Sequence, residues 1–341
     1  MSLVNTPLPP PGLGEFLGVS ATSSFVMPIA AAVLAVAYLM AAVGLWVRGR
    51  RWSIARTISF IVGCVLVALT TGLSLDDYSQ VMLSVFMFEQ LTLMMLVPPL
   101  LVLGSPVRLM LRSVPHRGLG RLVLVAGLSS LRSRLLRWVL HPVVSVLLFL
   151  LLFYGLYLGD LVDPILALPA GHVSLEVVFL VAGILFAIPI VSDDPVPIRM
   201  TYPARALDLS AEVALHAFFG VFLMISPTLI TDHFANPPAS LAIDPLVDQG
   251  IAGGLAWSYG EGPTVLILLY ILHRWFRDDT RKAEAADVRA DQFGDPDLDA
   301  YNDYLARLRG RGHKREHSGR GGDDLRVNDT DSSPTPKGGP Q

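Results

Sequence analysis

The chain has 341 residues, of which 52% are hydrophobic and only 16% are charged. A soluble domain of this length needs far more charged surface, so the composition predicts an all-α, polytopic membrane protein instead. The formal net charge of −3 gives no basis for nucleic-acid binding, and the single cysteine, Cys64, excludes a disulfide framework and any paired-cysteine metal motif.

Seven apolar segments are long enough to cross a bilayer, which requires about 20 consecutive apolar residues per helix. They form a transmembrane domain over residues 25–276. The preceding segment, 1–24, has no Lys or Arg and therefore lacks the basic region of a cleavable signal peptide. The predicted spans are 25–47, 54–74, 80–103, 141–159, 172–191, 207–230 and 250–275.

The basic residues lie on one side of this arrangement. None of the 26 Lys and Arg residues falls in the segments 1–24, 75–79, 160–171 or 231–249, which carry acidic residues only. All of them occur after the first, third or fifth span, at the start of the second, or from the end of the seventh span onward. Because Lys and Arg are enriched in cytoplasmic loops, this pattern predicts an N-terminus outside and a C-terminus inside.

Two further segments are expected on the basic side. Residues 107–140 alternate basic and apolar positions, which is typical of helices lying at the lipid headgroups, with docking of a partner as the alternative. Residues 277–341 are expected to form a cytoplasmic tail. An apolar stripe in this tail predicts a short amphipathic helix near 297–309, and the composition after Gly310 predicts disorder.

The third span carries the pair Pro98-Pro99 near its end. Each proline frees a backbone carbonyl of the preceding turn, so a kink or an unwound turn is expected there. The same helix holds several methionines, whose thioethers can bind Cu(I) but more often fill packed or lipid-facing surface. They are Met82, Met87, Met94 and Met95.

Polar side chains inside the spans are the functional candidates, because an ionisable group at the bilayer centre costs about 2.5–3.5 kcal/mol on insertion. Glu212 and His216 are four residues apart, so they share a helix face and can hydrogen-bond or share a metal. A buried polar network that joins helices and a path for protons or ions are the other two interpretations. The candidates are Glu89, Gln90, Glu176, Glu212, His216, Asp248, Gln249 and Glu261.

Several strings occur together in one order along residues 30 to 309. They are LTLMMLVPPLLVLGSPVRLMLR, LHP at 140–142, AGILFAIPIVSDDPVP, YPARALDL, LHAFFGVFLM, DQGIAGGLAWSYGEGP and LDAYNDYLARL. In combination they resemble the seven-helix cytochrome c oxidase assembly factors of the polytopic CtaG family.

The resemblance implies a bacterial plasma-membrane protein that matures the copper centres of haem–copper oxidase, with oxidase subunits and the lipid bilayer as partners. The chain departs from the family at positions where histidines or a methionine are expected. Two histidines four apart in the third span fall at Phe86 and Gln90, another falls at Val178, and the methionine falls at Ala256. The matching positions are His141, His172, His216, Asp248, Gln249, Trp257 and Glu261.

Three functions remain open on these grounds. The first is an oxidase assembly factor that binds its client or delivers copper, held weakly or transiently, with His172 and His216 as candidate ligands. The second is a scaffold for oxidase subunits that binds no metal, as the missing histidines suggest. The third, an alternative, is an ion- or proton-conducting transporter. No nucleotide-binding glycine loop or metalloprotease or hydrolase motif is present, so an enzyme is not expected.

Overall fold

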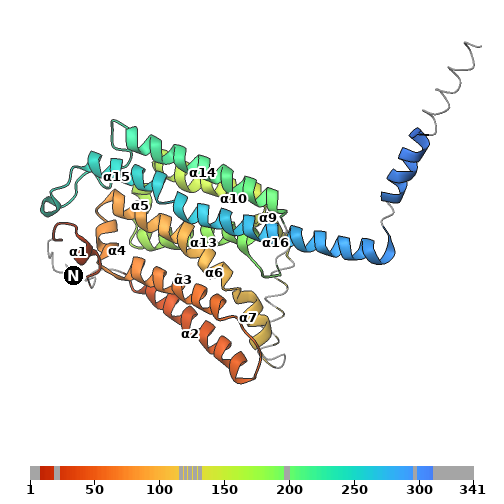
Figure 1. Cartoon of the computed structure of the whole chain (residues 1–341). Helices are drawn as coiled ribbons and strands as arrows, with labels where there is room; N and C mark the ends of the chain where they lie inside the picture. Colours follow the sequence, from red (N-terminus) through yellow and green to blue (C-terminus); the bar gives the residue numbers. More distant parts are fainter. Residues whose placement is uncertain are drawn as a thin grey trace, which may run out of the picture. The chain divides into compact units, whose positions relative to one another are not determined.

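The computed structural model describes residues 8–18, 24–114, 118, 121, 125, 129, 133–195, 200–294 and 298–309. These residues are predominantly helical and include no strand, which confirms the predicted fold class within this part of the chain. Two units, Met1–Trp275 and Phe276–Gln341, are described separately. The first unit is a helical bundle (Figure 1).

The bundle has two chemically different ends. The segments 73–82, 159–170 and 226–244, which contain no Lys or Arg, meet at one end, and we call it the acidic end. The loops around Arg56, Arg108 and Asp193 meet at the other, which we call the basic end. In Figure 1 the acidic end carries α1 and α4, and the basic end carries α7 and α9.

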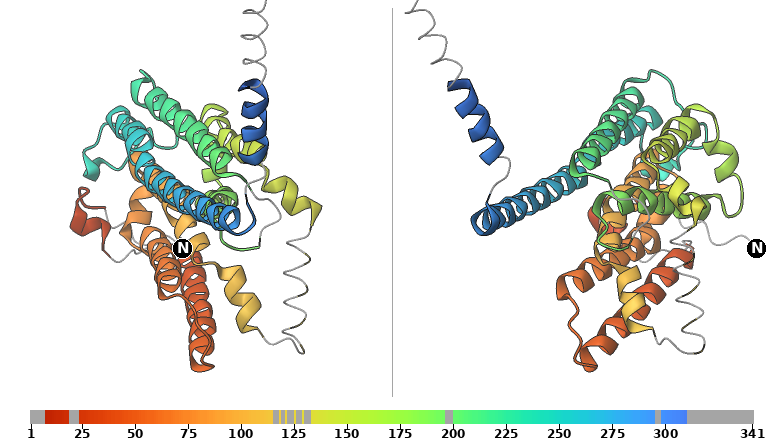
Figure 2. Two further views of the ribbon diagram at one scale, coloured as in Figure 1. Left: turned by 45° about the vertical axis from the view of Figure 1, so that its right-hand side comes forward. Right: turned by 90° about the vertical axis from the view of Figure 1, so that its right-hand side faces the viewer.

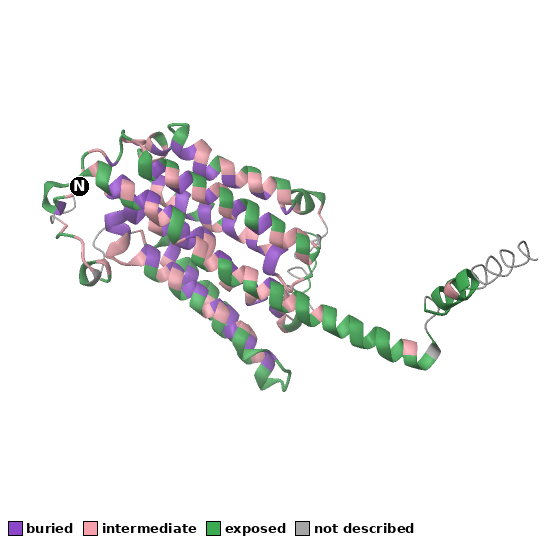
Figure 3. Ribbon diagram, turned by 45° about the horizontal axis from the view of Figure 1, so that its top comes forward, coloured by how far each residue is buried: buried purple, intermediate pink, exposed green. Residues whose placement is uncertain are grey.

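The first two spans form an antiparallel pair, α2 (Val26–Val47) and α3 (Ile54–Gly72), which lie side by side in Figure 2. Tyr38 of α2 stacks on Phe60 of α3 with ring centroids 4.1 Å apart. Large apolar side chains such as Val33 remain more than half exposed on the outer surface of α2. Figure 3 shows the buried residues turned toward the other helices. Apolar side chains on the outside and packed side chains within suit a helix in contact with lipid.

The third span stays helical through its prolines. It consists of α5 (Leu83–Leu91), the π-helical turn η1 (Thr92–Leu96) and α6 (Val97–Leu103), followed by α7 (Pro106–Ser113). The expected kink or unwound turn is replaced by this π turn, which begins six residues before Pro98. Gly183 lies directly against the carbonyl oxygen of Met94, four residues before Pro98, and leaves no space for a Cβ. The neighbouring helix thus covers a carbonyl that proline leaves without its helical donor.

Within the part of the chain that the structure describes, six helices are long and apolar enough to cross a membrane: Val26–Val47, Ile54–Gly72, Leu83–Ser113, Gly171–Val191, Tyr202–Ile225 and Pro245–Gln292. The predicted fourth span, 141–159, is instead a shorter apolar helix over Pro142–Leu158. It contains α10 (Pro142–Leu150), the π turn η2 (Leu151–Gly155) and α11 (Leu156–Leu158). At 1.5 Å per residue this helix is about 25 Å long, less than the usual hydrocarbon thickness of about 30 Å.

The sixth predicted span, 207–230, is displaced toward the N-terminus. Helix α14 covers Tyr202–Ile225, with the hydroxyl of Thr201 accepting a hydrogen bond from the backbone N–H of Ala204. It ends before Pro227 because the residue that precedes a proline disfavours the helical conformation. The preceding span, α13 (Gly171–Val191), agrees with the prediction to within one residue.

The seventh predicted span is divided into α15 (Pro245–Ser258) and α16 (Glu261–Phe293). Helix α16 continues well beyond the predicted end at residue 275, because the following residues include many strong helix formers (Ala, Arg, Lys and Glu) and no Gly or Pro until Gly294, whose φ is +77°. Residues 298–309 are also helical. The tail after Gly310, for which disorder is expected, lies outside the described residues.

The connections are short helices: α1 (Leu13–Phe16), α4 (Ser74–Ser79), α12 (Val162–Leu166) and the 3₁₀ turn η3 (Ala239–Leu241) at the acidic end, and α9 (Arg134–Val139) before α10. Helices α7 and α9 belong to the segment 107–140, for which surface helices are expected. Most of the residues between these two helices lie outside the described ranges.

Candidate functional site

Four ionisable side chains meet near the acidic end of the bundle, and we call them the acid–histidine cluster: Asp76 of α4, Glu89 of α5, and His172 and Glu176 of α13. The Nδ1 atom of His172 is 3.4 Å from Oδ1 of Asp76 and 3.6 Å from Oε1 of Glu176. Its Nε2 atom is 3.5 Å from Oε2 of Glu89. Three helices that are separate in the sequence therefore supply one site.

Local sequence explains part of this convergence. His172 and Glu176 are four residues apart in the first turns of α13, so both side chains lie on the same helix face. Asp76 lies in a six-residue helix that follows α3 directly, at the end of the bundle where α13 begins. Ser79 of the same short helix lies 2.9 Å from Nε2 of His172.

Burial makes negative charge on the carboxylates of the cluster unfavourable. Asp76, Glu89 and Glu176 are each less than 5% exposed, and His172 is the least buried member. Four of their six carboxylate oxygens have no hydrogen-bond partner: Oδ1 of Asp76, both Oε atoms of Glu89 and Oε2 of Glu176. Burial, followed by the nearby charge of Glu176, raises the pKa of Asp76 to about 8. Such a site requires protons or a cation to balance three carboxylates.

Sequence reasoning named three of the four members. Glu89, Glu176 and His172 were candidates because they lie inside or at the edge of apolar spans. Asp76 was counted only among the acids of a loop without Lys or Arg. The Asp76-Asp77 pair directly after an apolar span, on the same side as His172, is the signal that could have identified it.

Three other candidates form structural hydrogen bonds. The Oε1 atom of Gln90 accepts a 2.7 Å hydrogen bond from the hydroxyl of Tyr157. The carboxylate of Asp248 accepts hydrogen bonds from the hydroxyl and the backbone N–H of Ser84, which connects α15 to α5. Gln249 accepts from the N–H of Ile230 and donates to the carbonyl of Thr228, and so orders the segment that precedes α15.

Glu212 and His216 are buried on one face of α14, as their spacing predicts, but no hydrogen bond or ion pair joins them among the described residues. His216 packs edge-on against the rings of Phe149 and Phe153, and its Nε2 has no hydrogen-bond partner. Glu261 is only half-buried, at the start of α16. Within the described part of the chain these residues form no continuous hydrogen-bonded path, so the transporter alternative gains no support.

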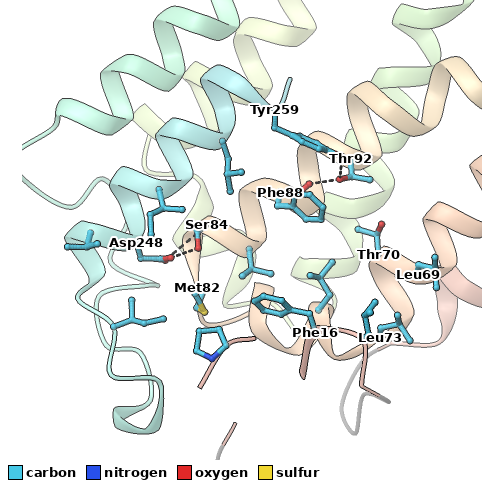
Figure 4. A pocket seen from close by; sticks show the side chains of 18 of the residues that line it. Phe16, Leu69, Thr70, Leu73, Met82, Ser84, Phe88, Thr92, Asp248 and Tyr259 are labelled. Atoms are coloured by element: carbon cyan, nitrogen blue, oxygen red, sulfur yellow. Dashed lines mark hydrogen bonds between the residues drawn. The ribbon is translucent and has the colours of Figure 1, made fainter. Parts of the chain in front are cut away.

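A pocket of about 910 Å³ opens beside the cluster-bearing helices, between α3, α5 and α15. Its walls are mainly apolar, and Figure 4 shows Leu69, Met82 and Phe88 among the side chains that line it. The polar side chains on this wall already have hydrogen-bond partners: Thr70 donates to the carbonyl of Leu66, and Asp244 accepts from the backbone N–H groups of Leu246 and Val247. Ser84 bonds to Asp248, and Thr92 bonds to Tyr259 at 3.1 Å.

The basic end contains a second charged group that sequence reasoning missed. Arg56 of α3 and Arg274 of α16 both bind the carboxylate of Asp193. Burial alone would raise the pKa of Asp193, but the hydrogen bond and charge of Arg274, with the charge of Arg56, hold it below its ordinary value. The neighbouring Asp194 accepts hydrogen bonds from the N–H groups of Val107 and Arg108 at the start of α7, although burial raises its pKa. These acids join three helices and the loop at this end.

One methionine lies beside a histidine of the bundle, because Sδ of Met95 and the ring of His216 both face Gly260, within 3 Å of the position that a Cβ there would take. Three others lie apart from it. Met82 packs with Tyr78 near the acidic end, Met87 lies in the central core, and Met224 is 42% exposed. Within the described residues, the one group of at least three His, Cys, Asp or Glu side chains with metal-site spacing is the acid–histidine cluster, which contains no sulfur.

The sequence was compared with known proteins. The family described as cytochrome c oxidase caa3 assembly factor (Caa3_CtaG) matches residues 36–278. Uncharacterized proteins of Mycobacterium bovis and Mycobacterium tuberculosis are each 35% identical to this chain over 308 residues, and one of Mycobacterium leprae is 34% identical over 305. Each alignment covers 88% of this chain but 46% of the relative, so the chain spans about half the length of these curated relatives. No solved structure matches the chain.

Proposed function

Because the chain belongs to the cytochrome c oxidase caa3 assembly factor family, we propose that it assists assembly of cytochrome c oxidase in a bacterial plasma membrane. Its partners on this proposal are subunits of the oxidase, and the protein carries out no catalytic step of its own. The match over residues 36–278, which begins within the first apolar helix and ends within the last, supports this function more strongly than any single residue does.

We propose further that it acts as a scaffold and does not carry Cu(I). A Cu(I) carrier needs several thioether, thiolate or imidazole ligands that converge on one point. The observation that carries the scaffold proposal is the chemistry of the acid–histidine cluster, which offers three carboxylates and one imidazole. Carboxylate oxygen is a poor ligand for Cu(I), so the residues present do not fit such a site.

At the positions where the family resemblance implies copper-binding histidines, this chain has other side chains, whose surroundings differ from one another. Phe86 is 1% exposed and packs against the ring of His172 at 5.6 Å between centroids. Gln90 is bonded to Tyr157. Val178 is 42% exposed on α13, where a side chain points away from the bundle core. A histidine at position 86 would therefore require repacking around His172, one at position 90 would lose the hydrogen bond from Tyr157, and one at position 178 would lie on the outer surface.

We also propose seven spans, with the N-terminus outside and the C-terminus in the cytoplasm. On this proposal the short helix Pro142–Leu158 crosses the membrane as the fourth span. The segregation of all 26 Lys and Arg residues supports the orientation, because the segments at the acidic end carry none. The acidic end would then face the outside.

Deletion of the gene tests the function. We expect the haem spectrum of assembled oxidase to decrease in the deletion strain, to return when the gene is restored, and to remain low when copper is added to the medium. The purified protein should carry well under one copper per chain. Full rescue by copper, or stoichiometric Cu(I) bound under reducing conditions and abolished by His172→Ala, would contradict the scaffold and support a carrier. An unchanged spectrum would contradict a function in oxidase assembly.

A further inference from the structure

The acid–histidine cluster has the geometry of a metal site that the family assignment does not require. We propose that Asp76, Glu89, His172 and Glu176 bind one divalent first-row cation, with Zn²⁺ as its representative, and that this cation joins α4, α5 and α13. The proposal concerns the purified chain alone. It does not depend on oxidase assembly, and the two can fail separately.

The distances between ligand atoms suit such an ion. One potential ligand atom from each residue lies within 4.8 Å of all the others. Zinc binds nitrogen and oxygen at about 2.0–2.2 Å, so neighbouring ligands in a tetrahedral site are about 3.3–3.6 Å apart. The separations of 3.4 and 3.6 Å from Nδ1 of His172 to Asp76 and Glu176 fall in this range.

A hydrogen bond next to the cluster indicates which ring nitrogen of His172 carries no proton and can bind a cation. The hydroxyl of Ser79 donates its single proton to the carbonyl oxygen of Asp76, at 2.8 Å. With this assignment, the 2.9 Å contact between Ser79 and Nε2 of His172 uses the proton on Nε2. Nδ1 is then left with a lone pair that faces the oxygens of Asp76 and Glu176. Lone pairs facing one another repel unless a proton or a cation lies between them.

Glu89 provides a second, independent indication of a ligand. It is 1% exposed, it is directed into the cluster, and neither of its carboxylate oxygens has a hydrogen-bond partner. A buried carboxylate without donors loses the full free energy of its hydration. Coordination to a cation would supply the missing partner for Glu89 and neutralise two of the three carboxylate charges.

The ligand set also selects among metals. Three carboxylates and one imidazole suit Zn²⁺ and similar borderline cations, whereas Cu(I) prefers sulfur and Mg²⁺ prefers oxygen ligands and water. The hydrogen bond from Nε2 to Ser79 would hold the imidazole in the ligating tautomer, as outer partners do at zinc sites. The ring of Phe86 lies against His172 and limits access of water from the bundle side.

Metal binding by the purified full chain in detergent tests the proposal. Protein stripped with a chelator should take up one Zn²⁺ per chain, measured by elemental analysis and titration calorimetry, and its midpoint of thermal unfolding should rise. Mg²⁺ at the same concentration should not compete. His172→Ala and Glu89→Gln should each weaken Zn²⁺ binding by at least about tenfold, and Ser79→Ala by about 10–100-fold, as expected for an outer partner.

Glu212→Gln is the matched control, because it alters a carboxylate that is 3% exposed but lies outside the cluster. It should bind Zn²⁺ like the unaltered protein. Circular dichroism identifies any variant that fails to fold, and the milder Ser79→Ala substitution then carries the test. Absence of bound Zn²⁺ in the folded, stripped protein, or binding that Glu89→Gln and Ser79→Ala leave unchanged, would overturn the proposal and favour shared protons in the cluster.

Discussion

Helices α14 and α15 cross at a pair of glycines, and this crossing predicts the effect of one methyl group. A Cβ atom on Gly253 would lie 2.5 Å from the backbone nitrogen of Met224 and 2.6 Å from the carbonyl oxygen of Gly220. Both obstacles are backbone atoms, so no change of rotamer can relieve the overlap. A Cβ atom added to Gly254, the neighbouring residue in α15, would have no other atom within 4 Å.

Gly253→Ala must therefore separate the two helices by about 0.9 Å to restore an ordinary contact distance of 3.4 Å. A gap of about 0.5–1 Å already loses a quarter to a half of each dispersion contact along the crossing. We expect the free energy of unfolding to fall by about 1–3 kcal/mol, the usual cost of an overpacked core position. Gly254→Ala should instead be neutral or stabilising by up to about 1 kcal/mol, because alanine favours the helix.

The free energy of unfolding of both variants and of the unaltered protein can be measured by equilibrium unfolding in detergent micelles with added denaturant. Near-ultraviolet circular dichroism monitors the transition. The two substitutions add the same methyl group to adjacent residues of one helix, so differences in expression or detergent binding largely cancel. Equal midpoints for Gly253→Ala and Gly254→Ala would refute the close crossing and the packing assigned to α15.

Three further predictions concern topology and polar contacts. Reporter fusions after residues 50, 120 and 200 should report cytoplasm, and fusions near 78, 165 and 240 the outside, since the second set lies among segments without Lys or Arg; an outside signal at 120 would contradict seven spans. Tyr157→Phe should lower the unfolding free energy by about 1–3 kcal/mol, because buried Gln90 loses its donor; an unchanged midpoint would mean that water replaces the hydroxyl. The folded-state pKa of Asp193 lies below its ordinary 3.8, so its contribution to stability is present above pH 3.8 and is lost as the pH falls through the folded value. Asp193→Asn should therefore lower the free energy of unfolding by about 1 kcal/mol or less at pH 7, because the ion pairs with Arg56 and Arg274 are partly exposed. Below the folded-state pKa the substitution should have no effect. A loss of stability that persists in acid would assign the effect to packing.

Prediction from sequence agrees best with the structure where a short stretch of chain alone determines where a helix begins and ends. The bounds of α2, α3 and α13 follow from apolar length, whereas α14 ends at Ile225, before Pro227 and five residues short of the predicted end at 230. The pair Pro98-Pro99 predicts a kink or an unwound turn in the third span. Its outcome, a π turn with Gly183 packed against the carbonyl of Met94, depends on a helix almost ninety residues away.

The candidate site divides in the same way. Burial of Glu89, Glu176, Glu212 and His216 follows from their places in apolar helices. Their partners do not follow, because helix rotation and the path of each loop decide which side chains meet. Glu212 and His216 share a helix face without bonding to each other. His172, by contrast, contacts Asp76, which lies in a six-residue helix too short for a periodic sequence pattern to predict.

The helical and apolar character of the chain, and the gathering of its basic residues at one end, can be predicted without a structure, because hydropathy and charge act residue by residue through the surrounding solvent. The packed helices are needed to bring Asp76, Glu89, His172 and Glu176 into one buried cluster and to join Arg56 to Arg274 through Asp193. Such convergence arises from contacts between distant segments, whose geometry depends on the packing of all the helices together.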